Sequence, residues 1–177
     1  MMTRNRSLGG LAAVLAVVVG LVWSNGTALT SFVFSQAMPA NYFSHFSYIK
    51  PALYQVSGPV YAFEHGFTRS LVLRTPQGIA VFDTFNEAHA TSMKTAIEKQ
   101  FPGETVRWVV LSHNHLDHVR GSVLFAGAEV IGHADVNMLV KDWPEAGKGI
   151  ASVTRPIRDD QTLDFGGIEV QALYMPY

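Results

Sequence analysis

The sequence contains no cysteine, and its 13 lysines and arginines form no cluster. Without cysteine the chain has no disulfide, no thiolate metal ligand and no cysteine nucleophile, so a metal site would have to use histidines and carboxylates. The formal net charge is -1, so the chain lacks the excess of basic residues that is typical of nucleic-acid-binding proteins. With 48% apolar residues in a chain of 177, the composition is that of a globular domain, and we expect no nucleic-acid partner.

Charged residues are missing from one long N-terminal stretch, since none lies between Arg6 and Lys50. Arg4 and Arg6 precede an apolar run at residues 8–23, and small residues follow it up to Ala28. This layout is typical of a secretory signal peptide that is cleaved after Ala28. An uncleaved membrane anchor is the alternative, because the run is only a little shorter than the roughly 20 residues that span a bilayer.

We therefore expect a signal peptide or anchor at residues 1–28, a linker at 29–50 and a folded domain at 51–177. Either kind of leader implies export, to the periplasm or outside the cell, with membrane contact only through an anchor. The leader is excluded from the fold prediction, because such a segment is removed or lies in the membrane.

The folded domain has the alternating pattern of an α/β protein. Short runs of β-branched and aromatic residues, separated by Gly and Pro turns, come before the first amphipathic stretch and predict an antiparallel meander followed by a helix. Strand and helix patterns then alternate, and Gly166 and Gly167 favour a hairpin turn between the last two strands. We predict strands at residues 53–56, 60–64, 70–74, 79–82, 106–111, 129–132, 154–157, 162–165 and 168–174, and helices at 86–100, 117–126 and 134–143.

Three of the seven histidines and one aspartate fall within residues 113–118, directly after the apolar run at 106–111. His113 and His115 are two apart where the chain leaves a strand, so their side chains project to the same side and can bind one cation. Asp117 and His118 follow where the chain turns into a helix, which directs them toward a neighbouring cation. Imidazole and carboxylate ligands suit zinc, with Mn or Fe as alternatives, and a bound metal generates a water nucleophile near neutral pH.

The six residues HNHLDH at 113–118 resemble the H-x-H-x-D-H signature of the metallo-β-lactamase superfamily. Residues 78–84, GIAVFDT, are similar to that family's strand ending in Asp-Thr, and residues 127–139 are similar to its next strand and helix. The resemblance implies an α/β (α+β) fold of the αββα sandwich type, of which this chain supplies only the N-terminal αβ half. It also implies a small-molecule substrate.

The same resemblance assigns roles to individual residues. His113 and His115 would bind the first zinc, and Asp117 and His118 the second, in a full-length parent with two ions. Asp117 would also be catalytic, orienting the nucleophile, and Asp83 would brace the metal loop from behind its ligands.

The sequence departs from the family pattern in two places. Arg120 stands where the family usually has glycine, and either it reaches toward substrate or it is solvated. No histidine follows His133, so the family's later ligands have no counterpart and we expect a chain truncated at its C-terminal end. Such a chain would leave apolar faces of the strands at 79–82 and 106–111 uncovered, which would favour self-association.

The remaining histidines are given weaker roles. His65 lies on an expected hairpin tip and is a candidate for substrate binding, while His133 is not assigned as a ligand. His45 and His89, like His65, are expected in loops or on the surface. Two further side chains, Met93 and Trp143, are expected in the core or at a helix cap.

Two functions from different classes remain open. The first is a metal-dependent hydrolase that activates water on a zinc or dizinc site to cleave a small ester, a lactone or a β-lactam. The alternative is a non-catalytic, truncated half-domain with an incomplete metal site.

Export makes a direct prediction about mass. The protein recovered from the periplasm or medium of an expressing bacterium should begin at Leu29, because the small residues before it fit signal-peptidase cleavage. Intact-mass spectrometry checks this. A protein that retains residues 1–28 and sediments with membranes would establish the anchor instead.

Overall fold

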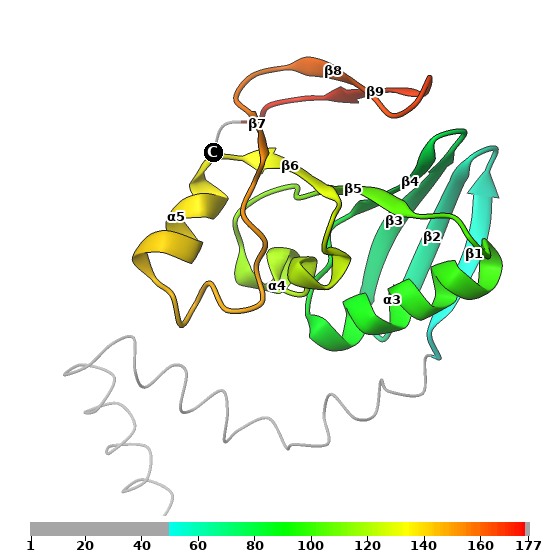
Figure 1. Cartoon of the computed structure of the whole chain (residues 1–177), viewed down its shortest axis with the longest axis horizontal. Helices are drawn as coiled ribbons and strands as arrows, with labels where there is room; N and C mark the ends of the chain where they lie inside the picture. The colour runs from blue at the N-terminus through cyan, green and yellow to red at the C-terminus, as the bar shows by residue number, and fades with distance from the viewer. Residues whose placement is uncertain (1–49, 176–177) are drawn as a thin grey trace, which may run out of the picture. The chain divides into compact units, whose positions relative to one another are not determined.

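The computed structural model describes residues 50–175, which form a seven-stranded sheet, a two-stranded hairpin and short helices (Figure 1). The expected leader and almost all of the linker, with His45, lie outside the described residues. Within residues 50–175, no helix is long and apolar enough to cross a membrane. The helices are α3 (Glu87–Gln100), α4 (Leu116–Val119), the 3-10 helix η2 (Ser122–Phe125) and α5 (Asp135–Asp142).

The large sheet follows chain order, from β1 to β7. Its first four strands pair antiparallel as a meander, and β4 to β7 pair parallel, with helical segments in the connections from β4 to β7. The hairpin of β8 and β9 forms separately. The strands are β1 (Ala52–Ser57), β2 (Val60–His65), β3 (Thr68–Thr75), β4 (Gly78–Phe82), β5 (Val106–Val110), β6 (Glu129–His133), β7 (Arg155–Ile157), β8 (Gln161–Asp164) and β9 (Glu169–Ala172).

The α/β prediction is confirmed, and each predicted strand appears near its predicted place. The single helix predicted at residues 117–126 was wrong, because the chain forms α4, a break at Gly121 and then η2. Gly121 has a left-handed φ of 86°, and a Cβ there would lie 2.6 Å from the carbonyl oxygen of Asn86. Glycine therefore permits both the break and the close approach of the two loops.

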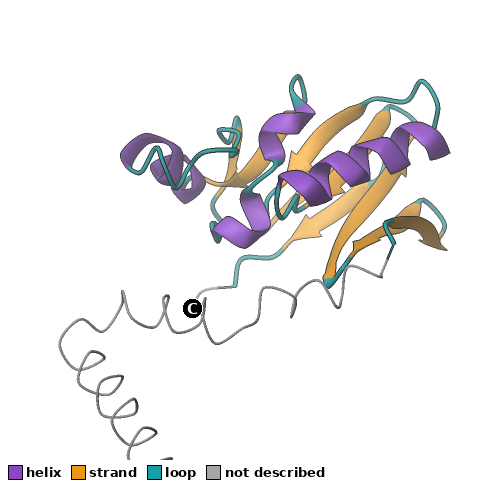
Figure 2. Cartoon of the chain, turned by 90° about the horizontal axis from the view of Figure 1, so that it is seen from below, coloured by secondary structure: helices purple, strands orange, loops and turns teal. Residues whose placement is uncertain are grey.

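The helices cover one face of the sheet (Figure 2). Helix α3 begins at its N-cap Asn86, whose side-chain Oδ1 accepts the backbone N–H of His89. The helix buries Met93 and Ile97 in the same cluster as Val81 and Val109 from the middle of the sheet. The expectation that Met93 belongs to the core is confirmed, and Trp143 is the C-cap residue of α5.

The opposite face carries the β8–β9 hairpin (Figure 1). Phe165 is fully buried there, with its ring edge-on to Trp108 at 5.5 Å between centroids, and Leu163 is 1% exposed. The expectation of uncovered apolar faces was therefore wrong for these strands, since Ala80 is fully buried and Val110 is 9% exposed. The sequence suggested the hairpin but not that it folds back over the sheet.

His89 was expected in a loop or on the surface, and this was wrong, because it lies in α3 and is 1% exposed. Its ring packs edge-on against Phe63, with 4.9 Å between centroids. Burial lowers the pKa of His89 to about 4, with a smaller contribution from His65 nearby. The imidazole is therefore neutral at pH 7.

The lowered pKa of His89 predicts a pH-dependent stability. Between pH 6.5 and pH 4 the unfolded chain takes up a proton on this residue and the folded chain does not, so the free energy of unfolding should fall as the pH falls. The loss from this one group is at most about 3 kcal/mol. Chemical denaturation of the wild type and of His89→Phe at pH 7, 6, 5 and 4 measures it.

The slope in this window should be shallower in His89→Phe. The control His133→Phe, which replaces a partly exposed histidine, should keep the wild-type slope. Equal slopes for the wild type and His89→Phe would contradict the assignment.

Candidate metal centre

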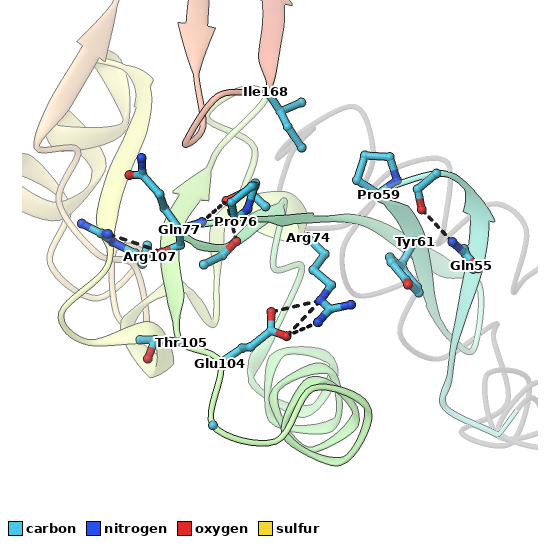
Figure 3. A pocket seen from close by; sticks show the side chains of 14 residues that line it. Gln55, Pro59, Tyr61, Arg74, Pro76, Gln77, Glu104, Thr105, Arg107 and Ile168 are labelled. Carbon is cyan, nitrogen blue, oxygen red and sulfur yellow. Dashed lines mark hydrogen bonds and ion pairs between the residues drawn. The ribbon is translucent and has the colours of Figure 1, made fainter.

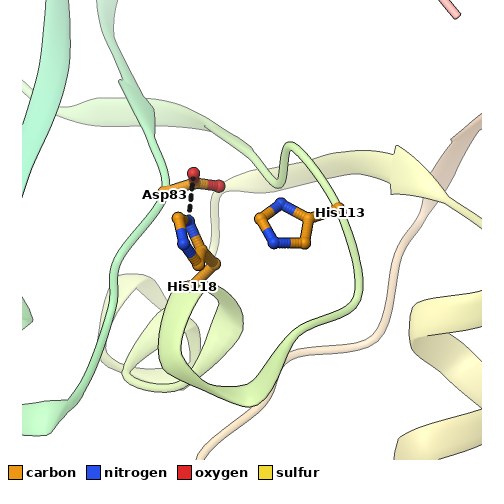
Figure 4. A group of neighbouring side chains, drawn as sticks. All are labelled: Asp83, His113 and His118. Atoms are coloured by element: carbon orange, nitrogen blue, oxygen red, sulfur yellow. Dashed lines mark hydrogen bonds and ion pairs between the residues drawn. The ribbon is translucent and has the colours of Figure 1, made fainter. Parts of the chain in front are cut away.

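The histidine cluster lies at the carboxyl ends of two neighbouring parallel strands. Asp83 follows β4, and the loop with His113 follows β5, which pairs with β4. Because parallel strands end at the same edge of a sheet, residues 29 positions apart in the sequence meet there, as Asp83 and Ser112 do. Figure 4 shows Asp83, His113 and His118 turned toward one another at this edge.

Three imidazole rings are in contact at this edge. The centroid of His113 lies 4.2 Å from that of His118 and 4.5 Å from that of His115. His113 and His118 are half-buried, whereas His115 and Asp117 are exposed. The structure thus brings the three predicted histidines together and leaves Asp117 facing solvent beside them.

By distance alone, Asp83 could itself be a metal ligand together with His113 and His118, because each of the three offers a ligand atom within 4.8 Å of the others. Both oxygens of Asp83 are already engaged, however. Oδ1 accepts the backbone N–H of Ser112 at 2.8 Å, and Oδ2 accepts the Ser112 hydroxyl at 2.7 Å and contacts His118 Nδ1 at 2.9 Å. These bonds favour Asp83 as a brace behind the ligands over Asp83 as a ligand.

The hydrogen bonds around Ser112 determine which nitrogen of each ring carries a proton. A carboxylate only accepts, so His118 Nδ1 must donate its proton to Asp83. The Ser112 hydroxyl has one proton and gives it to Asp83, so its contact with His113 Nδ1 at 2.8 Å requires that His113 donates as well. Both rings therefore carry Nδ1–H, and in the neutral form of each ring Nε2 is the unprotonated nitrogen.

An unprotonated Nε2 backed by an Nδ1–H···carboxylate bond is the usual arrangement of a metal-bound histidine. Burial lowers the pKa of His113, and the nearby His118 and His115 lower it further, against the opposing effect of Asp83 and Asp117. His113 is thereby held in the neutral form that binds a cation. The donor set of neutral imidazoles beside a carboxylate fits zinc.

The backbone directly after Asp83 is fixed by the loop that carries His118. The backbone N–H groups of Thr84 and Phe85 both donate to the His118 carbonyl at 3.0 Å, and the Thr84 hydroxyl donates to the Arg120 carbonyl at 2.9 Å. Asp83 itself has a left-handed φ of 56°, which costs a non-glycine residue about 1 kcal/mol. These contacts hold a strained residue in place and so set the direction of its carboxylate.

The two substrate-binding candidates lie outside the ring cluster. Arg120 is exposed, and its guanidinium donates weakly to the Ala146 carbonyl at 3.4 Å. His65 ends β2 and stacks on His89 with 6.0 Å between centroids. His133 contacts Asp135 at 3.2 Å and is not a member of the cluster.

Sequence reasoning missed one residue of the site, Ser112. Its hydroxyl links Asp83 to His113, and its backbone N–H holds the other carboxylate oxygen. The only sequence signal was its position directly before the histidine motif, which gives no indication of a partner 29 residues earlier.

A hollow of about 800 Å³ lies at the other end of the sheet (Figure 3). It includes Arg74, which forms a two-point ion pair with Glu104, and Arg107, whose guanidinium lies 5.3 Å from the ring centroid of Trp108. None of the clustered histidines lines it, and it lies at the amino ends of β4 and β5. Size alone therefore does not make it the candidate site.

The parallel strand ends and the braced imidazoles form a candidate metal site at a sheet edge. This chain belongs to the metallo-beta-lactamase superfamily, whose family model matches residues 64–177. The predicted family and fold are confirmed.

Known relatives support the same fold. A hydroxyacylglutathione hydrolase of Legionella pneumophila (strain Paris) is 28% identical over 78 residues, which are 41% of this chain and 25% of the relative. A subclass B3 metallo-beta-lactamase of Bradyrhizobium japonicum superposes with a TM-score of 0.61 at 20% identity, over 75% of this chain and 55% of the other. A class B3 di-zinc metallo-beta-lactamase from an Alaskan soil metagenome gives 0.63 at 18% identity, over 78% and 56%.

The covered fractions show how much of each relative this chain matches. The chain spans about half the length of these solved structures and a quarter of the curated relative.

The bonds to Asp83 predict a specific effect of removing its carboxylate. In the wild type, His113 and His118 should both be Nδ1–H tautomers, and Asp83→Ala should abolish that preference because the acceptor is gone. Zinc binding should weaken about 10- to 100-fold, as for other carboxylates behind metal-bound histidines. Long-range ¹⁵N–¹H correlation spectra and zinc titration measure the two effects.

Asp135→Ala is the matched control, because it removes the carboxylate beside His133 and leaves the cluster intact. Wild-type spectra with Nε2–H on both rings would contradict the hydrogen-bond assignment.

Proposed function

We propose that this chain contributes half of the active site of a zinc-dependent hydrolase. The observation that carries the proposal is the pair of imidazoles whose Nδ1–H groups donate to Asp83 and Ser112, which leaves the Nε2 atoms of two rings, 4.2 Å apart between centroids, free of protein partners in these bonds. A histidine with only a structural role in the core would have both ring nitrogens hydrogen-bonded to the protein, so these open Nε2 atoms favour a binding role.

His113 and His115 would hold the first metal ion, and Asp117 and His118 would hold the second. A bound zinc supplies Lewis acidity and lowers the pKa of water to near 7. Asp117 is exposed, and its charge opposes the lowering of the His113 pKa, so it lies near the ring cluster. Its carboxylate would orient an attacking water and accept a proton from it. Two zinc ions are proposed for the whole protein, with Mn or Fe as alternatives.

The substrate proposed is a small ester, a lactone or a β-lactam. A member of the superfamily with a di-zinc site and one named as a hydroxyacylglutathione hydrolase both resemble this chain, so cleavage of an activated carbonyl is the shared chemistry. Arg120 and His65 are proposed as substrate contacts, since each lies on a loop or strand end near this edge of the sheet.

We propose that the protein is exported, on the strength of the leader pattern at residues 1–28. We also propose self-association, through apolar side chains that the β8–β9 hairpin leaves exposed. Val56, Leu71 and Leu173 are exposed apolar residues available for it.

Residues 1–177 by themselves should bind zinc weakly and turn over little substrate. Tight zinc sites have at least three protein ligands held by partners, and His113, His115, Asp117 and His118 must be divided between two ions. Equilibrium dialysis with zinc, together with hydrolysis of a chromogenic β-lactam and of an ester, measures both properties. His113→Ala should abolish the zinc bound by the wild type, whereas His133→Ala should not change it.

Two results would change the proposal. Tight binding of two zinc ions with zinc-dependent turnover would show that the ligand set within these residues is complete. Zinc binding that is unaffected by His113→Ala would place the metal elsewhere and favour the alternative of a non-catalytic half-domain.

A further inference from the structure

Two buried polar side chains lie behind Asp83, on the side away from the clustered histidines. The Ser70 hydroxyl donates to the Asp83 backbone carbonyl at 2.7 Å, and His89 Nε2 lies 2.8 Å from the same hydroxyl. Ser70 and His89 are each 1% exposed, so water does not compete for these bonds. They join helix α3 and strand β3 to the residue that braces the histidines.

The direction of these bonds follows from the number of protons. Ser70 has one hydroxyl proton and a carbonyl can only accept, so that proton goes to Asp83 and His89 Nε2–H must donate to Ser70. The other ring nitrogen, Nδ1, then has no proton in the neutral ring. The Thr68 hydroxyl, 2.7 Å from Nδ1 and 2.9 Å from the His65 carbonyl, can donate its one proton to either acceptor but not to both. His89 therefore contacts a hydroxyl at each nitrogen, and its protonated Nε2 is directed at the Ser70–Asp83 pair.

A second set of contacts leads from His89 to the same edge of the sheet. The ring of Phe85 lies 4.9 Å from that of His89 and also 4.9 Å from that of His118, between centroids. Phe85 has a left-handed φ of 54°, so, like Asp83, it is held in a conformation that it would not adopt alone. One buried side chain thus contacts the supports of both Asp83 and His118.

We propose that His89 is a positioning residue of the metal centre, acting on Asp83 through Ser70 and on His118 through Phe85. The metal in this inference rests on the proposed function. The hydrogen bonds that position Asp83 and His118 are present without a metal. By holding the Asp83 carbonyl, His89 stabilises the left-handed backbone that turns the carboxylate toward Ser112 and His118.

The chain offers variants that separate this role from general stability. His89→Phe keeps an aromatic ring and removes both nitrogens, whereas His89→Gln keeps an N–H near the position of Nε2 and should restore function. Ser70→Ala removes the hydroxyl that relays the contact. Its matched control is Thr75→Val, because Thr75 lies on the same strand, is buried, and donates to the Gly78 carbonyl at 2.8 Å at the far end of the sheet.

The first measurement is hydrogen exchange of the Ser112 backbone amide, which donates to Asp83 Oδ1 and needs no metal. Its protection should fall about tenfold or more in His89→Phe and Ser70→Ala relative to the amides of β5, and stay at the wild-type level in His89→Gln and Thr75→Val. The second measurement is the zinc dissociation constant of the whole 177-residue chain. It should rise about tenfold in the same two variants, the lower end of the range for outer partners of metal ligands.

The outcomes separate the two proposals. A wild type that binds no zinc overturns the proposed function, and Ser112 exchange then decides the role of His89 by itself. Protection of Ser112 that is unchanged in Ser70→Ala, or equally reduced in Thr75→Val, overturns the positioning role. Should His89→Phe fail to fold, Ser70→Ala and its control give the same decision.

Discussion

The carboxylate of Asp83 is the interaction on which the candidate site depends. It takes three hydrogen bonds from two residues, and through them it sets the tautomers of His113 and His118. An imidazole with the wrong tautomer presents an N–H to a cation and cannot bind it, so the orientation of this one side chain decides whether the ring cluster is a ligand set. The surrounding structure can be understood as the means of holding Asp83 in a conformation that its backbone does not favour.

That support comes from both sides of the strand end. On one side the α4 loop receives the Thr84 and Phe85 amides at the His118 carbonyl, and Gly121 allows the loop to approach Asn86. On the other side, buried polar groups on β3 and α3 hold the Asp83 carbonyl. The Asp83 amide also donates to the Val110 carbonyl at 2.9 Å. A residue hydrogen-bonded at its amide, its carbonyl and its carboxylate has little freedom, which is the preorganisation that metal binding and catalysis require.

The two faces of the sheet are covered by different means. Helices pack on one face with a continuous aliphatic core, while the β8–β9 hairpin brings Leu163 and Phe165 to the other. Because the hairpin covers the central strands, the site-bearing loops start from a packed sheet within residues 50–175. The likeness to solved superfamily members covers about half of their length, so the ligands and substrate contacts that the rest of such a protein supplies remain part of the proposal.

The sequence by itself determined the local features. The order of strands and helices, the family, the histidine cluster and the role of Met93 in the core could all be predicted, because periodicity, turn residues and motif spacing are properties of short segments. Only the tertiary structure decided the partners of these residues. Ser112 and Asp83 are 29 residues apart, and His89 and Ser70 are 19 apart. The hairpin could fold over the sheet or away from it. These outcomes depend on which strands become neighbours and on which side chains are shielded from water. His89 illustrates the reason. Its spacing from Met93 and Ile97 puts it on the apolar face of α3, but the hydroxyl groups that allow a histidine to be buried there come from strand β3.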